Sequence, residues 1–214
     1  MPGSIKIDDG SGNYTILTNA GSLGSDKTIT IPNETATLAT TTASNLGGLV
    51  LIETKTNDGT NSGLSFDNCF TSTYSNYKII TETTGSESLE ARLRASSSDD
   101  TTAAYGSTMV YRYIEGSTST GVDRTTDGQQ WRWAYQGSGG SVNKVGSTNY
   151  VYGPQEATPT VFSGFCISNW NHGNSLSSDF AGVYTNSTQF DGITILDSAG
   201  SNWTGQVSIY GIVE

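Results

Sequence analysis

The chain has 214 residues and a formal net charge of −10, with 10 Lys and Arg against 20 Asp and Glu. We expect no nucleic-acid partner and no attraction to an anionic membrane, because either surface would need clustered basic side chains. Charged residues make up only 14% and aromatic residues 10% of the chain, a composition unlike that of disordered proteins. With 11 Tyr, 26 Gly and frequent Thr, the composition predicts an all-β fold.

Residues 1–48 are expected to form an extended, β-rich arm and neck. Short strands at 5–7 and 14–17 would flank a turn of Asp, Gly, Ser and Asn. The first six residues contain no apolar run, and no stretch of the chain approaches the roughly 20 apolar residues of a membrane-spanning helix. We therefore expect neither a signal peptide nor a membrane span. Residues 43–48, ending in two glycines, are expected to be a linker.

Residues 28–40 alternate polar with apolar side chains on both sides of Pro32, which cannot donate a hydrogen bond in a sheet. Ile29, Ile31 and Leu38 are the larger apolar side chains of this pattern. Strand pairs this short are marginally stable in water when they are isolated. We therefore predict that these three residues serve assembly, by packing against other copies of the chain or against a partner.

Residues 49–214 contain a series of segments with strand character, separated by clusters of Gly, Ser and Asn. The segments are 49–54, 77–82, 89–94, 108–114, 130–135, 160–167, 180–184, 192–196 and 205–212. The first is continuously apolar, which predicts a buried central strand, and the last predicts that the C-terminal segment lies in a sheet. Many short strands with turns between them indicate a β-sandwich, jelly-roll-like in its architecture.

Trp131 and Trp133 alternate with polar or small residues, and Tyr135 continues the pattern. In a strand this spacing places the three rings on one face. An exposed face would offer a stacking platform for sugar rings, whereas a buried face would belong to the core or to packing between subunits. The buried interpretation is favoured, and Trp131 and Trp133 stay as candidate glycan contacts.

Residues 169–174 combine an aromatic ring, several amides and the single histidine of the chain, in a segment whose Gly and Asn content indicates a loop. Trp170 could stack on a sugar ring while Asn171, His172 and Asn174 hydrogen-bond to its hydroxyls. The alternative is a loop whose tryptophan is anchored against the sandwich. The pair at 202–203 is a weaker candidate of the same kind.

Metal, cofactor and catalytic sites have little support in the sequence. Cys69 and Cys166 lie in apolar surroundings without Cys-x-x-Cys spacing, so reduced, buried thiols are favoured over a disulfide between them. Acidic pairs such as residues 8–9 and 99–100 lack the spacing of a calcium-binding loop. With no P-loop and no Gly-x-Ser-x-Gly motif, we expect neither a metal, nor a cofactor, nor an enzymatic activity.

Two parts of the chain resemble proteins of one class. Residues 25–42, with the pattern TITIP…TATLAT, resemble a segment that is common in bacteriophage tail-fibre and virion proteins, just before a globular tip. Residues 66–80, 89–94 and 205–211 resemble a β-sandwich module at the ends of fibres of marine and cyanobacterial phages. The resemblance implies that residues 1–48 form an arm wound with two other copies, and that residues 49–214 form the tip.

The resemblance therefore predicts a structural protein located in the virion: a short homotrimeric fibre or spike. Its arm would attach to other virion structural proteins, and its tip would bind carbohydrate on the host surface, with three weak sites acting together. One alternative is a capsid decoration (cement) protein with a projecting β-sandwich. Another is a free glycan-binding, lectin-like module, which would be a monomer that does not need residues 1–48.

Overall fold

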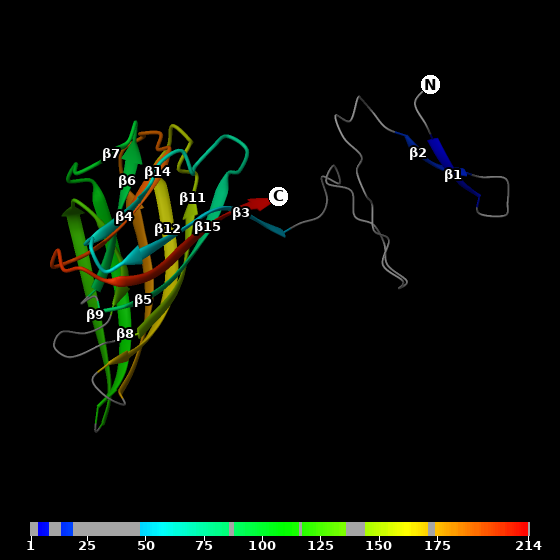
Figure 1. Ribbon diagram of the computed structural model, residues 1–214. Helices are drawn as coiled ribbons and strands as arrows, with labels where there is room; N and C mark the ends of the chain where they lie inside the picture. Colours follow the sequence, from blue (N-terminus) through cyan, green and yellow to red (C-terminus); the bar gives the residue numbers. More distant parts are fainter. Residues whose placement is uncertain are drawn as a thin grey trace. The chain divides into compact units, whose positions relative to one another are not determined.

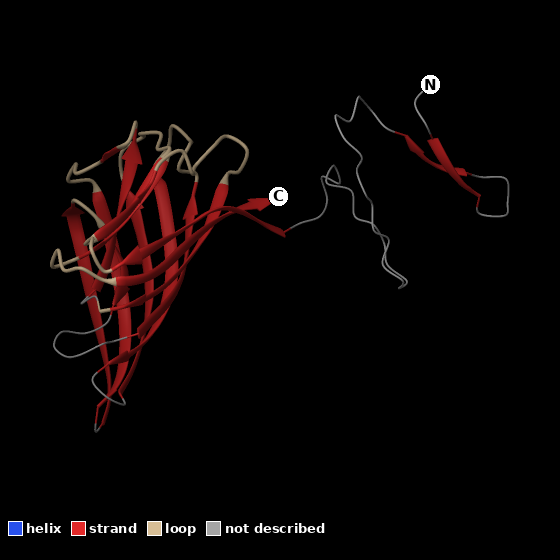
Figure 2. Cartoon of the chain, in the orientation of Figure 1, coloured by secondary structure: helices blue, strands red, loops and turns tan. Residues whose placement is uncertain are grey.

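The computed structural model describes residues 4–8, 14–18, 48–85, 88–115, 117–135, 144–170 and 174–213 (Figures 1 and 2). The chain divides into two compact units, Met1–Ala43 and Ser44–Glu214. Every regular element in the described ranges is a β-strand, which confirms the predicted all-β class. Those ranges contain no helix long and apolar enough to cross a membrane.

In the first unit, β1 (Ser4–Asp8) and β2 (Tyr14–Thr18) pair as an antiparallel hairpin. Ile5 lies opposite Leu17, and Ile7 lies opposite Thr15. The two strands overlap the segments 5–7 and 14–17 expected from the sequence, and the role of this region as an arm stays a prediction. Ile29, Ile31 and Leu38 lie outside the described residues, and their role in assembly stays a prediction.

The described residues of the second unit form two antiparallel sheets. The larger sheet has eight strands in the order β3-β15-β5-β11-β12-β13-β8-β9. In that order the strands are Gly48–Asp58, Thr204–Val213, Asn76–Thr84, Lys144–Tyr152, Thr160–Trp170, Asn174–Tyr184, Tyr105–Glu115 and Ser117–Gly128. The smaller sheet runs β10 (Trp131–Tyr135), β6 (Ser88–Ala95), β14 (Gly192–Asp197), β4 (Gly63–Phe66), with β7 (Ser98–Asp99) beside β6. The final strand lies between β3 and β5, as predicted for the C-terminal segment.

The apolar run at residues 49–54 predicts a buried central strand, and this prediction is wrong. The run lies in β3, which is the edge strand of the larger sheet. Leu49, Val50 and Leu51 are 46%, 43% and 55% exposed. A continuous apolar run shows that both faces of a strand are apolar, but it does not show whether another strand covers its open edge or another sheet covers its faces.

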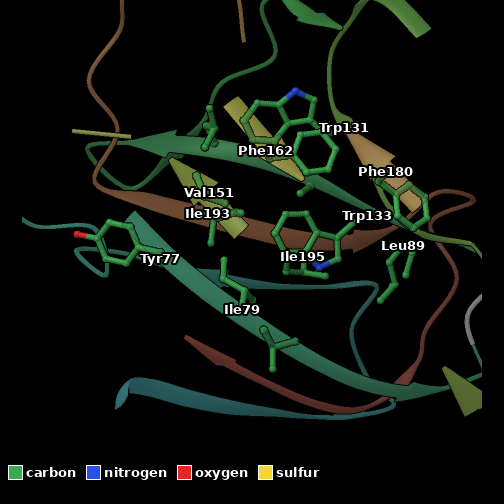
Figure 3. Packing of buried hydrophobic residues seen from close by; sticks show 14 of the residues in the cluster. Tyr77, Ile79, Leu89, Trp131, Trp133, Val151, Phe162, Phe180, Ile193 and Ile195 are labelled. Carbon is green, nitrogen blue, oxygen red and sulfur yellow. The ribbon is translucent and has the colours of Figure 1, made fainter. Parts of the chain in front are cut away.

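The core lies between the two sheets, and the alternation of each strand selects the side chains that enter it. In β5, for example, Tyr77 and Ile79 are fully buried while Ile80 is exposed. Trp131 of β10 stacks on Phe162 of β12, with ring centroids 4.6 Å apart (Figure 3). Trp131 also meets Tyr105 edge-on at 5.4 Å. The strands of both sheets thus share one aromatic cluster.

Both tryptophans of β10 belong to this core, since Trp131 and Trp133 are each 0% exposed. The Trp133 indole N–H donates to Thr81 Oγ1 of the larger sheet at 3.3 Å. The buried interpretation is therefore confirmed, and an exposed sugar platform built on these two rings is excluded. A register shift between Arg132 and Ala134 also breaks the expected alternation, so Ala134 is buried and Tyr135 is only partly buried.

The two cysteines are free and buried, as favoured from the sequence. Cys69 donates to the carbonyl oxygen of Phe66 at 3.7 Å, and Cys166 donates to that of Tyr135 at 3.6 Å. Burial raises the pKa of the Cys69 thiol to about 12 and that of the Cys166 thiol to about 11. Both therefore stay protonated at neutral pH and act as small apolar core groups.

Replacing Trp131 tests its place in the core. We expect Trp131→Ala to lower the free energy of unfolding by about 3–5 kcal/mol, because it opens a cavity between the sheets. Trp131→Phe should cost less, since it keeps a ring against Phe162 and removes an indole N–H that has no hydrogen-bond partner. Denaturant unfolding of the two variants measures both effects. A change within about 0.5 kcal/mol for Trp131→Ala would instead indicate a surface position.

Candidate functional site

An open hollow of about 470 Å³ lies beside the smaller sheet, where β6 and β10 meet the end of β9. Its walls are mostly polar. The lining residues are Glu90, Arg92, Ala103, Thr125, Asp127, Gly128, Gln129, Gln130 and Arg132. Two acidic and two basic side chains line it, so its formal charge is balanced although the whole chain is strongly acidic.

Strict alternation in β6 brings charged side chains to this hollow. The sequence Leu-Glu-Ala-Arg-Leu-Arg at residues 89–94 places Leu89, Ala91 and Leu93 in the core, all 0% exposed. The intervening Glu90 and Arg92 consequently point to the outer face of the smaller sheet. On the neighbouring strand, Arg132 is the register partner of Glu90.

Gln130 connects two of the charged side chains in the hollow. Its amide oxygen accepts hydrogen bonds from Arg92 Nε at 3.0 Å and from Arg92 Nη2 at 2.6 Å. Its amide nitrogen donates to Glu90 Oε2. Arg132 is held by a different partner, since its Nη2 forms an ion pair with Asp123 Oδ2 at 3.1 Å. The guanidinium, amide and carboxylate groups therefore have defined positions before any ligand arrives.

Glu90 is the least exposed acid in the hollow, at 9%. Burial raises the pKa of its carboxyl group, and this effect outweighs the opposing influence of Arg132, the Gln130 hydrogen bond and Arg92. A partly desolvated carboxylate with a raised pKa is common at binding and catalytic sites.

A second network lies next to the hollow and supports it. Arg94 donates to Asp67 at 2.8 Å and to Thr194 at 2.9 Å, and it also pairs with Asp99. Burial alone would lower the pKa of Arg94, but the hydrogen bonds and charges of Asp67 and Asp99 outweigh it and raise the pKa. Arg92 reaches the same Asp99 at 3.9 Å, so the two networks share one carboxylate.

The groups in the hollow suit hydrogen bonding to a polyhydroxy ligand. Carboxylate and amide oxygens accept hydrogen bonds from hydroxyl groups, while guanidinium and amide N–H groups donate to them. The balanced charge gives no preference for a polyanion. Among the described residues, no group of three or more His, Cys, Asp or Glu side chains could hold a metal ion.

The described loop candidates, Trp170, Asn174 and Trp203, are not among the residues that line this hollow. Trp170 is the last residue of β12 and Asn174 is the first residue of β13, and the two pair with each other. The predicted loop 169–174 therefore included strand residues at both of its ends. Asn171 and His172 lie outside the described residues. The weaker candidate Trp203 is 1% exposed and donates to the Ser62 carbonyl oxygen at 3.0 Å, so it belongs to the core.

Strand register places the hollow and the paired end of β12 and β13 near opposite ends of β8. Near that paired end, Leu176 of β13 pairs with Tyr113, whereas Tyr105 pairs with Gly128, which lines the hollow. The eight residue steps from Tyr105 to Tyr113 span about 27 Å of strand. A role of Trp170 and Asn174 in glycan binding stays a prediction.

Comparisons with models of protein families, with curated proteins and with solved structures found no match. The candidate site consequently depends on its geometry: one partly desolvated carboxylate, two guanidinium groups and a bridging amide around an open hollow. The alternation in residues 89–94 was the sequence signal for outward charges in this region. Gln130 and Arg132, however, are brought to β6 only by strand pairing.

Glu90→Gln tests the raised pKa. Below pH 4.5, the ordinary value for Glu, the carboxyl group is protonated in both folded and unfolded chains. As the pH rises above 4.5 the unfolded chain loses this proton first, so the raised pKa makes the wild type progressively less stable until the folded group also ionises. The variant has no such proton to lose.

We therefore expect the stability of Glu90→Gln relative to wild type to increase between pH 4 and pH 7, as measured by thermal unfolding. Glu156→Gln, at an exposed acid in the segment between β11 and β12, controls for the loss of one negative charge. A difference between Glu90→Gln and wild type that stayed constant or shrank over this range would contradict the raised pKa.

Proposed function

We propose that this chain is a structural protein of a bacteriophage particle, a short homotrimeric fibre or spike whose tip binds saccharide on the host surface. The phage assignment is supported by the resemblance of residues 25–42 and of the later strand segments to fibre proteins. The division into a small N-terminal unit and a larger two-sheet unit is compatible with an arm and a jelly-roll-like tip.

The observation that carries the binding role is the polar hollow with its Arg92–Gln130–Glu90 network. Saccharides present closely spaced hydroxyl groups, and this network offers both donors and acceptors at fixed positions. Two acidic and two basic side chains make a neutral saccharide the better match. Because none of the described residues that line the hollow is aromatic, each site would bind weakly, and three sites on one particle would act together.

Arg132 offers the sharpest test of this role. We expect the full chain to bind neutral members of a printed saccharide array, and Arg132→Ala to weaken binding of the selected soluble saccharide about tenfold, as for a lost hydrogen bond to a charged group. Titration calorimetry with the monovalent sugar measures the affinity independently of avidity.

Arg124→Ala is the matched control, because Arg124 lies on β9, one residue before the hollow-lining Thr125, and points to the opposite face of the strand. Its affinity should equal that of wild type. Absence of binding across the array, or equal affinity for Arg132→Ala and wild type, would contradict a saccharide site in the hollow and favour a purely structural role such as capsid decoration.

The homotrimer has its own test. Light scattering of the purified full chain should give about three times the chain mass of 22.6 kDa at micromolar concentration. A monomer at these concentrations would contradict the fibre or spike and favour the free lectin-like module. Gold-labelled antibody on phage particles then distinguishes the tail from the capsid.

A further inference from the structure

The larger sheet has an outer face that no other described element of the same unit covers. In the described part of the unit, the core and the smaller sheet lie on its inner face. The outward side chains follow from the alternation in each strand. Several are large and apolar: Ile80, Val122, Val161, Phe165 and Ile167, with exposures of 37%, 71%, 43%, 45% and 55%.

Strand register joins four of these side chains into one patch. Thr148 of β11 pairs with Ile80 on one side and with Phe165 on the other, which makes one row across three strands. Val161 and Ile167 lie on β12, on the same side as Phe165. Next to them on β11, Tyr150 and Tyr152 stack with ring centroids 6.2 Å apart.

Such a patch differs from the ordinary surface of an antiparallel sheet. A solvated sheet face normally carries polar side chains, and single exposed apolar residues are unremarkable. A contiguous group of branched and aromatic side chains on neighbouring strands indicates instead a surface that another molecule covers.

The charge of this face, compared with that of the whole chain, indicates what kind of molecule covers it. Its described side chains include four basic and three acidic groups: Lys78, Arg112, Arg124, Lys144, Asp58, Glu82 and Asp179. The face is thus close to neutral, whereas the whole chain carries −10. Two ion pairs already balance charges on it, Arg112 with Asp179 and Lys144 with Glu82.

Copies of a chain with a charge of −10 repel one another, and the repulsion is weakest where the facing surfaces are neutral. An apolar and nearly neutral face is therefore the part of this unit best suited to contact another copy. The chain enters the two-sheet unit at Gly48, the first residue of β3, and this edge of the larger sheet carries further exposed apolar side chains, Leu49 and Leu51.

We propose that the outer face of the larger sheet, centred on Ile80, Phe165 and Ile167, is the surface through which one copy of this chain contacts the next. The proposal rests on the proposed homotrimer and adds a site to it within the tip. The contact would cover the apolar patch and the exposed start of β3.

Charge substitution on the patch tests this surface in the full chain. We expect Phe165→Asp and Ile167→Asp each to weaken self-association at least tenfold in analytical ultracentrifugation, because a contact would have to bury an unpaired carboxylate. Ala157→Asp adds the same charge at an exposed position between β11 and β12 and should associate like wild type. Both patch side chains point to solvent in the single chain, and circular dichroism checks that the variants fold.

Hydroxyl-radical footprinting of the wild type gives a measurement that needs no variant. Phe165 and Ile167 should become protected as the concentration rises from the monomeric to the associated range, while the exposed Glu156 should not change. A wild-type oligomer that persists in both Asp variants, with no protection of the patch, would overturn this surface and leave the proposed homotrimer standing. A wild-type monomer would overturn the homotrimer and this surface together, while the Arg132 saccharide test would still decide the binding role.

Discussion

The burial of two indoles from one short strand is the constraint on which the candidate site depends. Trp131 and Trp133 anchor β10 to the larger sheet through Phe162 and Thr81. Between them, Arg132 points to the other side of the strand and lies opposite Glu90. The packing of the core thereby sets the position of a guanidinium group on the surface, and a loss of either indole would be expected to displace it.

Hydrogen bonds and ion pairs beside the hollow also hold the polar side chains of the smaller sheet in place. Arg94 is almost buried, and Asp67, Asp99 and Thr194 satisfy its charge and its donors. A buried guanidinium group with such partners resists movement, because leaving it unpaired would cost several kcal/mol. Since Arg92 shares Asp99 with Arg94, the arginine that lines the hollow is linked to a buried one.

The sequence predicted the strands whose two faces differ clearly in polarity. The alternation at residues 89–94 is an example, because every second residue is apolar and enters the core. Strand β11 was missed, since its inward positions include Ser147 and Asn149, which hydrogen-bond to each other at 3.0 Å. Asn149 fits there because Gly164 lies opposite, where an added Cβ would meet the Asn149 oxygen at 1.7 Å. Strand β9 was missed because its one large apolar residue, Val122, points outward.

The candidate site was less predictable than the strands, and the reason is its dependence on pairing between distant segments. Glu90 and Gln130 are 40 residues apart in the chain, and their contact requires the register between β6 and β10. That register contains a shift between Arg132 and Ala134, which no local pattern indicates. The sequence instead pointed to Trp131 and Trp133, whose spacing is the same for an exposed platform and for a buried layer.

The two outer faces of the two-sheet unit differ in polarity, and this difference is consistent with the proposed trimer. The smaller sheet presents charged side chains and the polar hollow, while the larger sheet presents apolar and nearly neutral surface. In a two-sheet unit these faces point in opposite directions. Copies in contact through the larger sheet would therefore direct their hollows away from one another. Each hollow would remain open to a saccharide, which is the arrangement that binding by several weak sites requires.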